Sequence, residues 1–207
     1  DLLNKERRLI GEPQLSWLVD TYGNSEVAWN ILGQQVLMTK LKFPDISSAL
    51  SKSNLSEEVK QYLPLLKLGL PSNLDAWDGY PAERDRIFSL FKNNNSKLIS
   101  LAGDTHNAWF SKLFNNAEEH IGYEFGTPSV TSPGLSEYLN GVNPGELEQG
   151  IINANKEIKW VNTSHRGYTK IYLNESILKG TFKFIESVLD KSAEISFSKT
   201  FTIDPKS

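Results

Sequence analysis

YPAERDRIFSLFKNNNSKLISLAGDTH, residues 80–106, is the stretch that decides the fold. Pro81 is suited to the first turn of a helix, three consecutive asparagines end the helical pattern, and residues 97–102 are almost entirely apolar. Such an apolar run is typical of a strand in a sheet that is covered on both faces. An acid and an imidazole, Asp104 and His106, follow the predicted strand directly, where α/β proteins place their sites.

The same order of helix and strand occurs earlier in the chain, where a helical pattern around residues 15–19 is followed by an apolar run over 28–32. Residues 47–63 predict short helices. The two segments TFKFIESVL and ISFSKTFTI alternate apolar and polar residues, which predicts a final antiparallel pair with one solvated face. The sequence therefore predicts an α/β fold with a mixed sheet, helices and a C-terminal antiparallel strand pair. The remaining predicted elements are strands near 121–125, 167–173, 179–188 and 194–203, and a helix near 145–156.

Composition narrows the class of protein. The 207 residues, 39% hydrophobic and 23% charged, suffice for one sizeable core and predict one globular domain. A net charge of -3 without any basic block disfavours nucleic acid as a dedicated partner. No apolar stretch approaches the roughly 18 residues of a membrane span, so no membrane partner is expected. The absence of cysteine excludes disulfides and thiolate metal ligands within the chain.

Asp104 and His106 are the main candidates for chemistry. In an extended segment, residues i and i+2 point to the same side, so a carboxylate and an imidazole at this spacing can converge on one metal ion. Oxygen and nitrogen donors without sulfur fit iron, manganese, zinc or calcium. The alternative is that Asp104 caps the next turn and His106 is a solvated loop residue.

Four blocks of the sequence carry a resemblance to a known family. AWNILGQQVLM (28–38), LDAWDGYPAERDRIFSLF (74–91), LISLAGDTHNAWF (98–110) and EFGTPSVTSPG (124–134) occur in an order that resembles the PhoD-type alkaline phosphatase and phosphodiesterase family. WDGYPAER and GDTH are the most specific parts. The resemblance implies a binuclear metallophosphoesterase fold, an αββα sandwich in which metals and substrate phosphate occupy loops beyond the strand ends.

The resemblance also assigns roles to individual residues. Asp104 and His106 match the late metal-ligand motif of the family. Gln34 and Gln35 fall near the position where related phosphoesterases carry a metal-binding histidine, so an amide oxygen facing the site is one expectation, and a structural hydrogen bond is the other.

The block WDGYPAERDR holds two candidates for substrate contact, Tyr80 and Arg84, because arginine presents a fork of donors suited to phosphate. The favoured interpretation is structural, an aromatic loop followed by a salt-bridged helix start. Trp77 and Trp109 are interpreted as packing residues.

Serine-hydrolase chemistry is a weak alternative. Its candidate pairs are Ser129 or Ser132 with His106 or His165. The sequence contains no G-x-S-x-G elbow, and a nucleophile also needs a positioned base. Glu124 and Thr131 belong to the same constrained loop block. His120 is expected to be solvated, and His165 to make local hydrogen bonds.

The family pattern includes earlier acidic ligand blocks that do not occur here, so residues 1–207 are expected to be the C-terminal part of a single metallophosphoesterase catalytic domain. The full-length protein is expected to hydrolyse phosphate esters by metal-activated water, with divalent or trivalent iron, calcium, manganese or zinc, and this chain alone is expected to be inactive. The alternative is a non-catalytic scaffold that binds a partner or a phosphorylated ligand. The expected partners are a phosphate ester, the missing N-terminal half and a second copy at an exposed sheet edge. The resemblance implies a periplasmic or secreted location.

Overall fold

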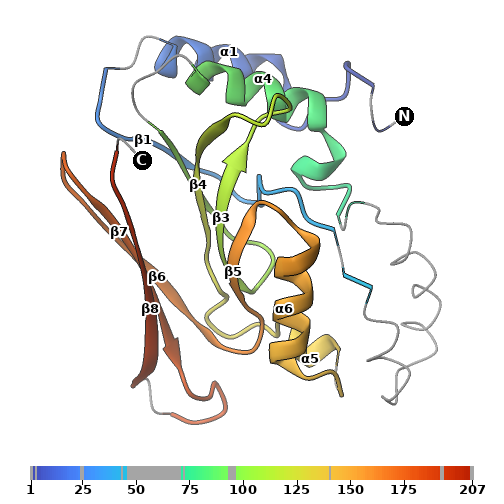
Figure 1. Cartoon of the computed structure of the whole chain (residues 1–207), viewed down its shortest axis with the longest axis vertical. Coiled ribbons are helices and arrows are strands. Elements are labelled where there is room, and N and C mark those ends of the chain that lie inside the picture. Colours follow the sequence, from blue (N-terminus) through green and yellow to red (C-terminus); the bar gives the residue numbers. More distant parts are fainter. Residues whose placement is uncertain are drawn as a thin grey trace.

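The structure is a computed structural model that describes residues 2, 4–23, 26–42, 44–45, 71, 73–92, 97–139, 141–191 and 194–205. The short helices predicted within residues 47–63 lie outside the described residues. The described part is built from two sheets and a layer of helices, as Figure 1 shows. This mixed α/β organisation confirms the predicted fold class.

The larger sheet is mixed, and its order is β1-β2-β4-β3-β5. β1, β2 and β4 run parallel, whereas β3 is antiparallel to both β4 and β5. β2 is the strand predicted from residues 97–102, and it lies inside the sheet with parallel neighbours on both sides. The strands are β1 (Asn30–Gly33), β2 (Leu98–Ala102), β3 (Ala108–Phe114), β4 (His120–Gly126) and β5 (Ile158–Asn162).

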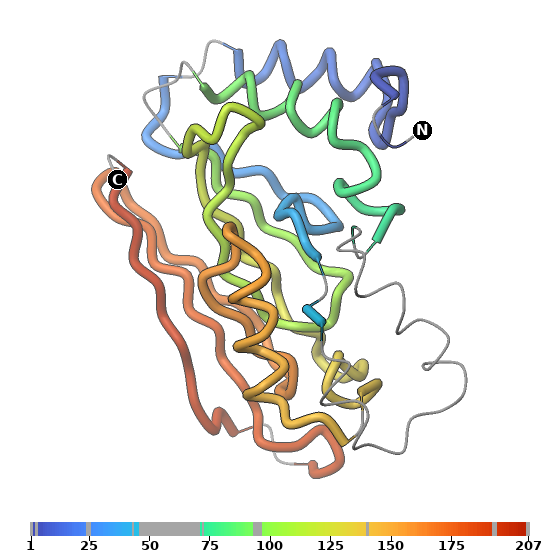
Figure 2. Tube along the Cα trace, turned by 45° about the vertical axis from the view of Figure 1, so that its right-hand side comes forward, coloured from blue at the N-terminus to red at the C-terminus, as the bar shows by residue number. Residues whose placement is uncertain are grey.

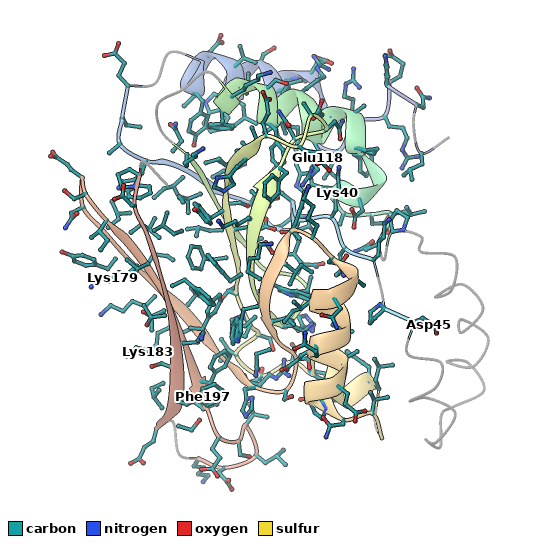
Figure 3. All side chains as sticks on the ribbon, in the orientation of Figure 1. Lys40, Asp45, Glu118, Lys179, Lys183 and Phe197 are labelled. Atoms are coloured by element: carbon teal, nitrogen blue, oxygen red, sulfur yellow. The ribbon has the colours of Figure 1, made fainter. Side chains whose placement is uncertain are left out.

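The smaller sheet is antiparallel and has the order β6-β7-β8, with β6 at Arg166–Leu173, β7 at Leu178–Ile185 and β8 at Ile195–Ile203. The predicted C-terminal strand pair is therefore confirmed, and β6 extends it. Alternate residues of β7 are buried, as one solvated face requires. Lys179 and Lys183 point outward from β7, away from the larger sheet (Figure 3).

Aromatic side chains fill the space between the two sheets. The Phe110 ring of β3 stacks on the Phe201 ring of β8 with centroids 3.9 Å apart, and Phe125 of β4 packs on Phe182 of β7. Phe182 and Phe184 are fully buried. Burial of this apolar surface holds the two sheets face to face.

Helices cover the other face of the larger sheet. α1 (Gly11–Tyr22) and α4 (Pro81–Lys92) lie side by side (Figure 2), and their apolar residues join Leu98 of β2 in one core cluster. α6 (Pro144–Ala154) packs on β5, away from α1 and α4 (Figure 1). Two short elements complete the set, the 3-10 helix η1 (Trp77–Gly79) and α5 (Leu135–Tyr138). In the described part of the chain the layers thus run from helices to the mixed sheet to the antiparallel sheet.

Candidate metal site

The segment with Asp104 and His106 begins where β2 ends, beside two other strand ends. The backbone N–H of Gly103 donates to the carbonyl of Gln35 at 3.0 Å, and the N–H of Thr127 donates to the carbonyl of Ala102 at 2.7 Å. The chain segments that follow β1, β2 and β4 therefore meet here. This edge of parallel strands is the usual location of sites in α/β sheets.

The backbone around the two candidate ligands is not extended. Asp104 has φ of +65° and His106 has φ of +60°, both in the left-handed region that non-glycine residues rarely adopt. The N–H of Thr105 donates to the carbonyl of Gly103 at 2.7 Å, which closes a tight turn around Asp104. The assumption of an extended segment behind the i, i+2 argument is therefore wrong, because the strand stops at Ala102. That both side chains face one ion stays a prediction.

The His106 ring is held by a carbonyl. Nδ1 lies 3.0 Å from the oxygen of Pro133, and because a carbonyl can only accept, Nδ1 carries the proton of the neutral ring. Nε2 then retains its lone pair, the form of imidazole that ligates a metal. The Asp104 side chain is exposed to solvent at the same turn.

Neighbouring residues anchor this turn. The buried indole of Trp109 donates from Nε1 to Oγ1 of Thr105 at 2.6 Å. Asn107 is buried, and its Oδ1 accepts from the N–H of Leu135 at 3.0 Å. These bonds fix Thr105 and Asn107, which flank His106. Trp109 is 1% exposed, in agreement with its predicted packing role.

Arg166 is a further part of the site that the sequence analysis did not identify. It is the first residue of β6, its side chain is 4% exposed, and its Nη1 donates to the backbone carbonyl of His106. Nη2 pairs with the carboxylate of Glu137 at 3.1 Å and donates to the carbonyl of Thr163 at 3.1 Å. Burial lowers the pKa of Arg166, opposed by Glu137. No periodicity or motif marks an arginine that reaches from one sheet to a loop of the other.

The two glutamines after β1 take different positions. Gln34 is part of an internal network, because its Oε1 accepts from Nε1 of Trp77 at 2.8 Å and its Nε2 donates to Oγ of Ser100 at 3.2 Å. Its amide thus has the structural role given as one of the two expectations. Gln35 is exposed, and its carbonyl binds Gly103 next to Asp104. Gln35 is therefore the glutamine that stays a candidate for the site.

A buried carboxylate organises the loop that follows Gln35. Glu124 of β4 is fully buried, and burial raises its pKa. Its oxygens accept from the N–H groups of Met38 and Thr39, both at 2.8 Å, and from Oγ of Ser100 at 2.8 Å. These donors lower the pKa in opposition to burial. Glu124 thus ties the loop after β1 to β2 and β4.

The guanidinium of Arg84 is buried and bonded to protein partners. The side chain is 2% exposed, donates from Nε to the carbonyl of Met38 at 2.5 Å, and pairs through Nη2 with Glu157 at 3.0 Å. Its Nη1 donates to the carbonyl of Phe114, at the end of β3 away from the site. The Tyr80 ring lies under the guanidinium of Arg7, 4.8 Å from its centroid. These contacts fit the structural interpretation of Tyr80 and Arg84, and a substrate contact by either residue stays a prediction.

The serine and histidine side chains of the hydrolase alternative make local contacts. Ser129 donates from Oγ to the carbonyl of Ser132 at 2.5 Å, while His165 contacts the side chain of Asn162, as local hydrogen bonding predicts. His120 was expected to be solvated, whereas its side chain is half-buried. Its ring packs edge-on against Tyr123, and burial followed by the nearby lysine charges lowers its pKa to about 4.

The donor set fits part of a metal site. Asp104 offers carboxylate oxygens and His106 offers Nε2, donors suited to hard and borderline cations. Within the described residues, no group of three or more His, Cys, Asp or Glu side chains is placed to hold a metal ion. Asp104 and His106 can therefore act as two ligands of a larger set.

Comparisons with known proteins identify the family of the chain. A family model described as PhoD-like phosphatase matches residues 1–182. Alkaline phosphatase D of Bacillus subtilis (strain 168) is 29% identical over 203 residues, which cover 96% of this chain and 30% of that protein. A solved structure described as "Structure of PhoD" matches with a TM-score of 0.71 and 25% identity, over 99% of this chain and 35% of that one. No helix in the described residues has the length and apolarity needed to cross a membrane.

Proposed function

Because the chain belongs to the PhoD-like phosphatase family, we propose that it supplies the later part of the active site of a metal-dependent phosphatase or phosphodiesterase. The observation that carries this proposal is the position of Asp104 and His106 in the tight turn at the carboxyl end of β2. In this proposal residues 1–207 are the C-terminal part of one catalytic domain. The 30% share of the Bacillus subtilis relative that the chain spans supports it.

Two side chains have roles in the proposed reaction. Asp104 provides negative charge at the turn, and His106 presents Nε2 while Pro133 holds Nδ1. Metal ions bound there would activate a water molecule and neutralise charge on the phosphoryl oxygens of the ester. The metal is iron, calcium, manganese or zinc, in keeping with an oxygen and nitrogen donor set.

The remaining ligands come from an N-terminal half of the same domain, the substrate is a phosphate ester, and the protein is periplasmic or secreted, as the family resemblance implies. Most of β8 is exposed at the edge of its sheet, which supports self-association of the chain through an unpaired edge. A weight-average mass that stays monomeric at all concentrations in sedimentation velocity would contradict the self-association.

The alternative is a non-catalytic scaffold that binds a partner or a phosphorylated ligand. Elemental analysis and hydrolysis of p-nitrophenyl phosphate and its diester decide between the two, on a longer protein that contains this chain. The enzyme proposal predicts bound metal and turnover that both fall in Asp104→Asn, because an amide is a poorer ligand than a carboxylate. Asp20→Asn is the matched control, an exposed carboxylate on α1. Equal metal content and turnover in Asp104→Asn would overturn the proposal.

A further inference from the structure

The backbone of His106 needs an external restraint. A non-glycine residue rarely adopts the left-handed region, and such a conformation persists only where the surroundings fix it. His106 and Asp104 both adopt it, two residues apart. What holds the His106 carbonyl therefore determines where its imidazole lies.

Arg166 is the side chain that holds this carbonyl. Its guanidinium is buried and joins three segments, the His106 turn, the loop of Ser129, and α5 through Glu137. The N–H of Ser129 also donates to the His106 carbonyl, at 3.4 Å. The N–H of Gly167, the residue after Arg166, donates to the carbonyl of Ser129 at 2.9 Å.

Gly134 closes the other side of the guanidinium. A Cβ at this glycine would lie 2.5 Å from Nη2 and 2.6 Å from Nη1 of Arg166, and 2.6 Å from Oδ1 of Asn107. Only glycine therefore leaves room for the guanidinium in its present place. Gly134 follows Pro133, whose carbonyl binds Nδ1 of His106, so the same loop contacts both the arginine and the ring.

We propose that Arg166 is a positioning residue for His106, and that its guanidinium fixes the His106 carbonyl so that Nδ1 stays on Pro133 and Nε2 stays available as a ligand. The role of Nε2 as a metal ligand rests on the proposed function, whereas the orientation of the His106 ring does not. Arg166 is not required to touch substrate or metal. Its effect is transmitted through one backbone carbonyl and one loop.

The first test is the ring tautomer of His106 in the 207-residue chain without metal, read from the ¹⁵N shifts of the imidazole by NMR. Wild type is expected to show the Nδ1–H tautomer. Arg166→Lys and Gly134→Ala are each expected to shift the population toward a mixture, because lysine cannot bridge the same partners and an alanine displaces the guanidinium. Gly134→Ala keeps every charge and serves if Arg166→Lys does not fold.

Two matched controls isolate the effect. Arg84→Lys changes another buried, carboxylate-paired arginine, at a distance from the site. Gly33→Ala adds a methyl group at a position with nothing within 4 Å. Both controls should leave the His106 signals as in wild type. Wild-type signals in Arg166→Lys and Gly134→Ala, or equal changes in the controls, would overturn the positioning role.

The second readout is Mn²⁺ titration of the same variants. Loss of a residue that orients a ligand typically weakens metal affinity about 10- to 100-fold. A changed tautomer with no Mn²⁺ binding at His106 in any variant would keep the positioning role and contradict the proposed function. The opposite result is that Arg166→Lys leaves both Mn²⁺ binding at His106 and the ring tautomer unchanged. That result would support the proposed function and overturn the positioning role.

Discussion

The indole N–H of Trp109 donates to the hydroxyl of Thr105, 2.6 Å away, and Thr105 lies between the two candidate metal ligands. The indole is buried in the core cluster with Leu147 and Val161, so a side chain of the core fixes the turn of the site directly. The stability of the fold and the shape of the site are therefore linked at this contact.

Thr105→Val is expected to destabilise the chain by about 1 to 3 kcal/mol, because it leaves the buried N–H of Trp109 without its acceptor. Urea unfolding measures the loss. Adding Trp109→Phe should make the double variant less destabilised than the sum of the single changes, since both polar groups are then gone. The control is Thr200→Val, at an exposed hydroxyl pair on the antiparallel sheet. A Thr105→Val loss no larger than the control would contradict the contact.

Arg84→Met is expected to cost about 3 to 5 kcal/mol, because it leaves the carboxylate of Glu157 buried without its partner. The side chains of this pair are 2% and 7% exposed. Arg86→Met is the matched control, since Arg86 pairs with Glu12 on the surface, where the side chains are 46% and 59% exposed. An exposed pair contributes about 1 kcal/mol or less. Similar unfolding free energies for the two variants would show that the Arg84 pair is not buried as described.

Asp78 gives the chain a pH-dependent stability. Burial raises the pKa of this carboxyl from 3.8 to about 6, while the N–H of Leu41, donating at 3.0 Å, opposes the rise. The folded state therefore favours the protonated acid. Its stabilising contribution is complete below pH 4 and is lost as the pH rises through about 6.

Asp78→Asn is expected to gain stability relative to wild type between pH 4 and pH 7, by on the order of 2 kcal/mol. His120 acts in the opposite direction, because its lowered pKa makes the folded state lose stability as the pH falls from 6.5 through about 4. Comparing the two proteins at each pH cancels the His120 contribution. A difference in unfolding free energy that is constant across this range would contradict the raised pKa of Asp78.

The sequence predicted those elements whose local pattern is strong. β2 and α4 follow from an apolar run and a proline-led helix, and the alternation in β7 follows from one buried face. β3 was missed for two reasons. Its residues are almost all buried, so apolar and polar residues do not alternate, and it begins directly after the turn, so no spacer marks its start. β5 has only five residues and begins just beyond the helix predicted to end near residue 156, and no strand was predicted there.

The candidate site was predictable only in part. Asp104 and His106 were identified from their residue types and from their position after a strand. The left-handed backbone at both residues was not predicted, because tertiary contacts impose it against local preference. The restraints imposed by Arg166 and Pro133 depend on segments 60 and 27 residues from His106 in the chain, and no local pattern encodes such contacts.

Paramagnetic broadening by Mn²⁺ in NMR spectra of the 207-residue chain tests whether Asp104 and His106 bind one metal ion. Mn²⁺ is expected to broaden the signals of Asp104 and His106 first, at weak affinity because two ligands hold the ion. Asp104→Asn and His106→Asn should each remove that broadening, whereas Asp20→Asn should keep it. Broadening that begins elsewhere in the chain, or that persists unchanged in both site variants, would contradict a metal site at the end of β2.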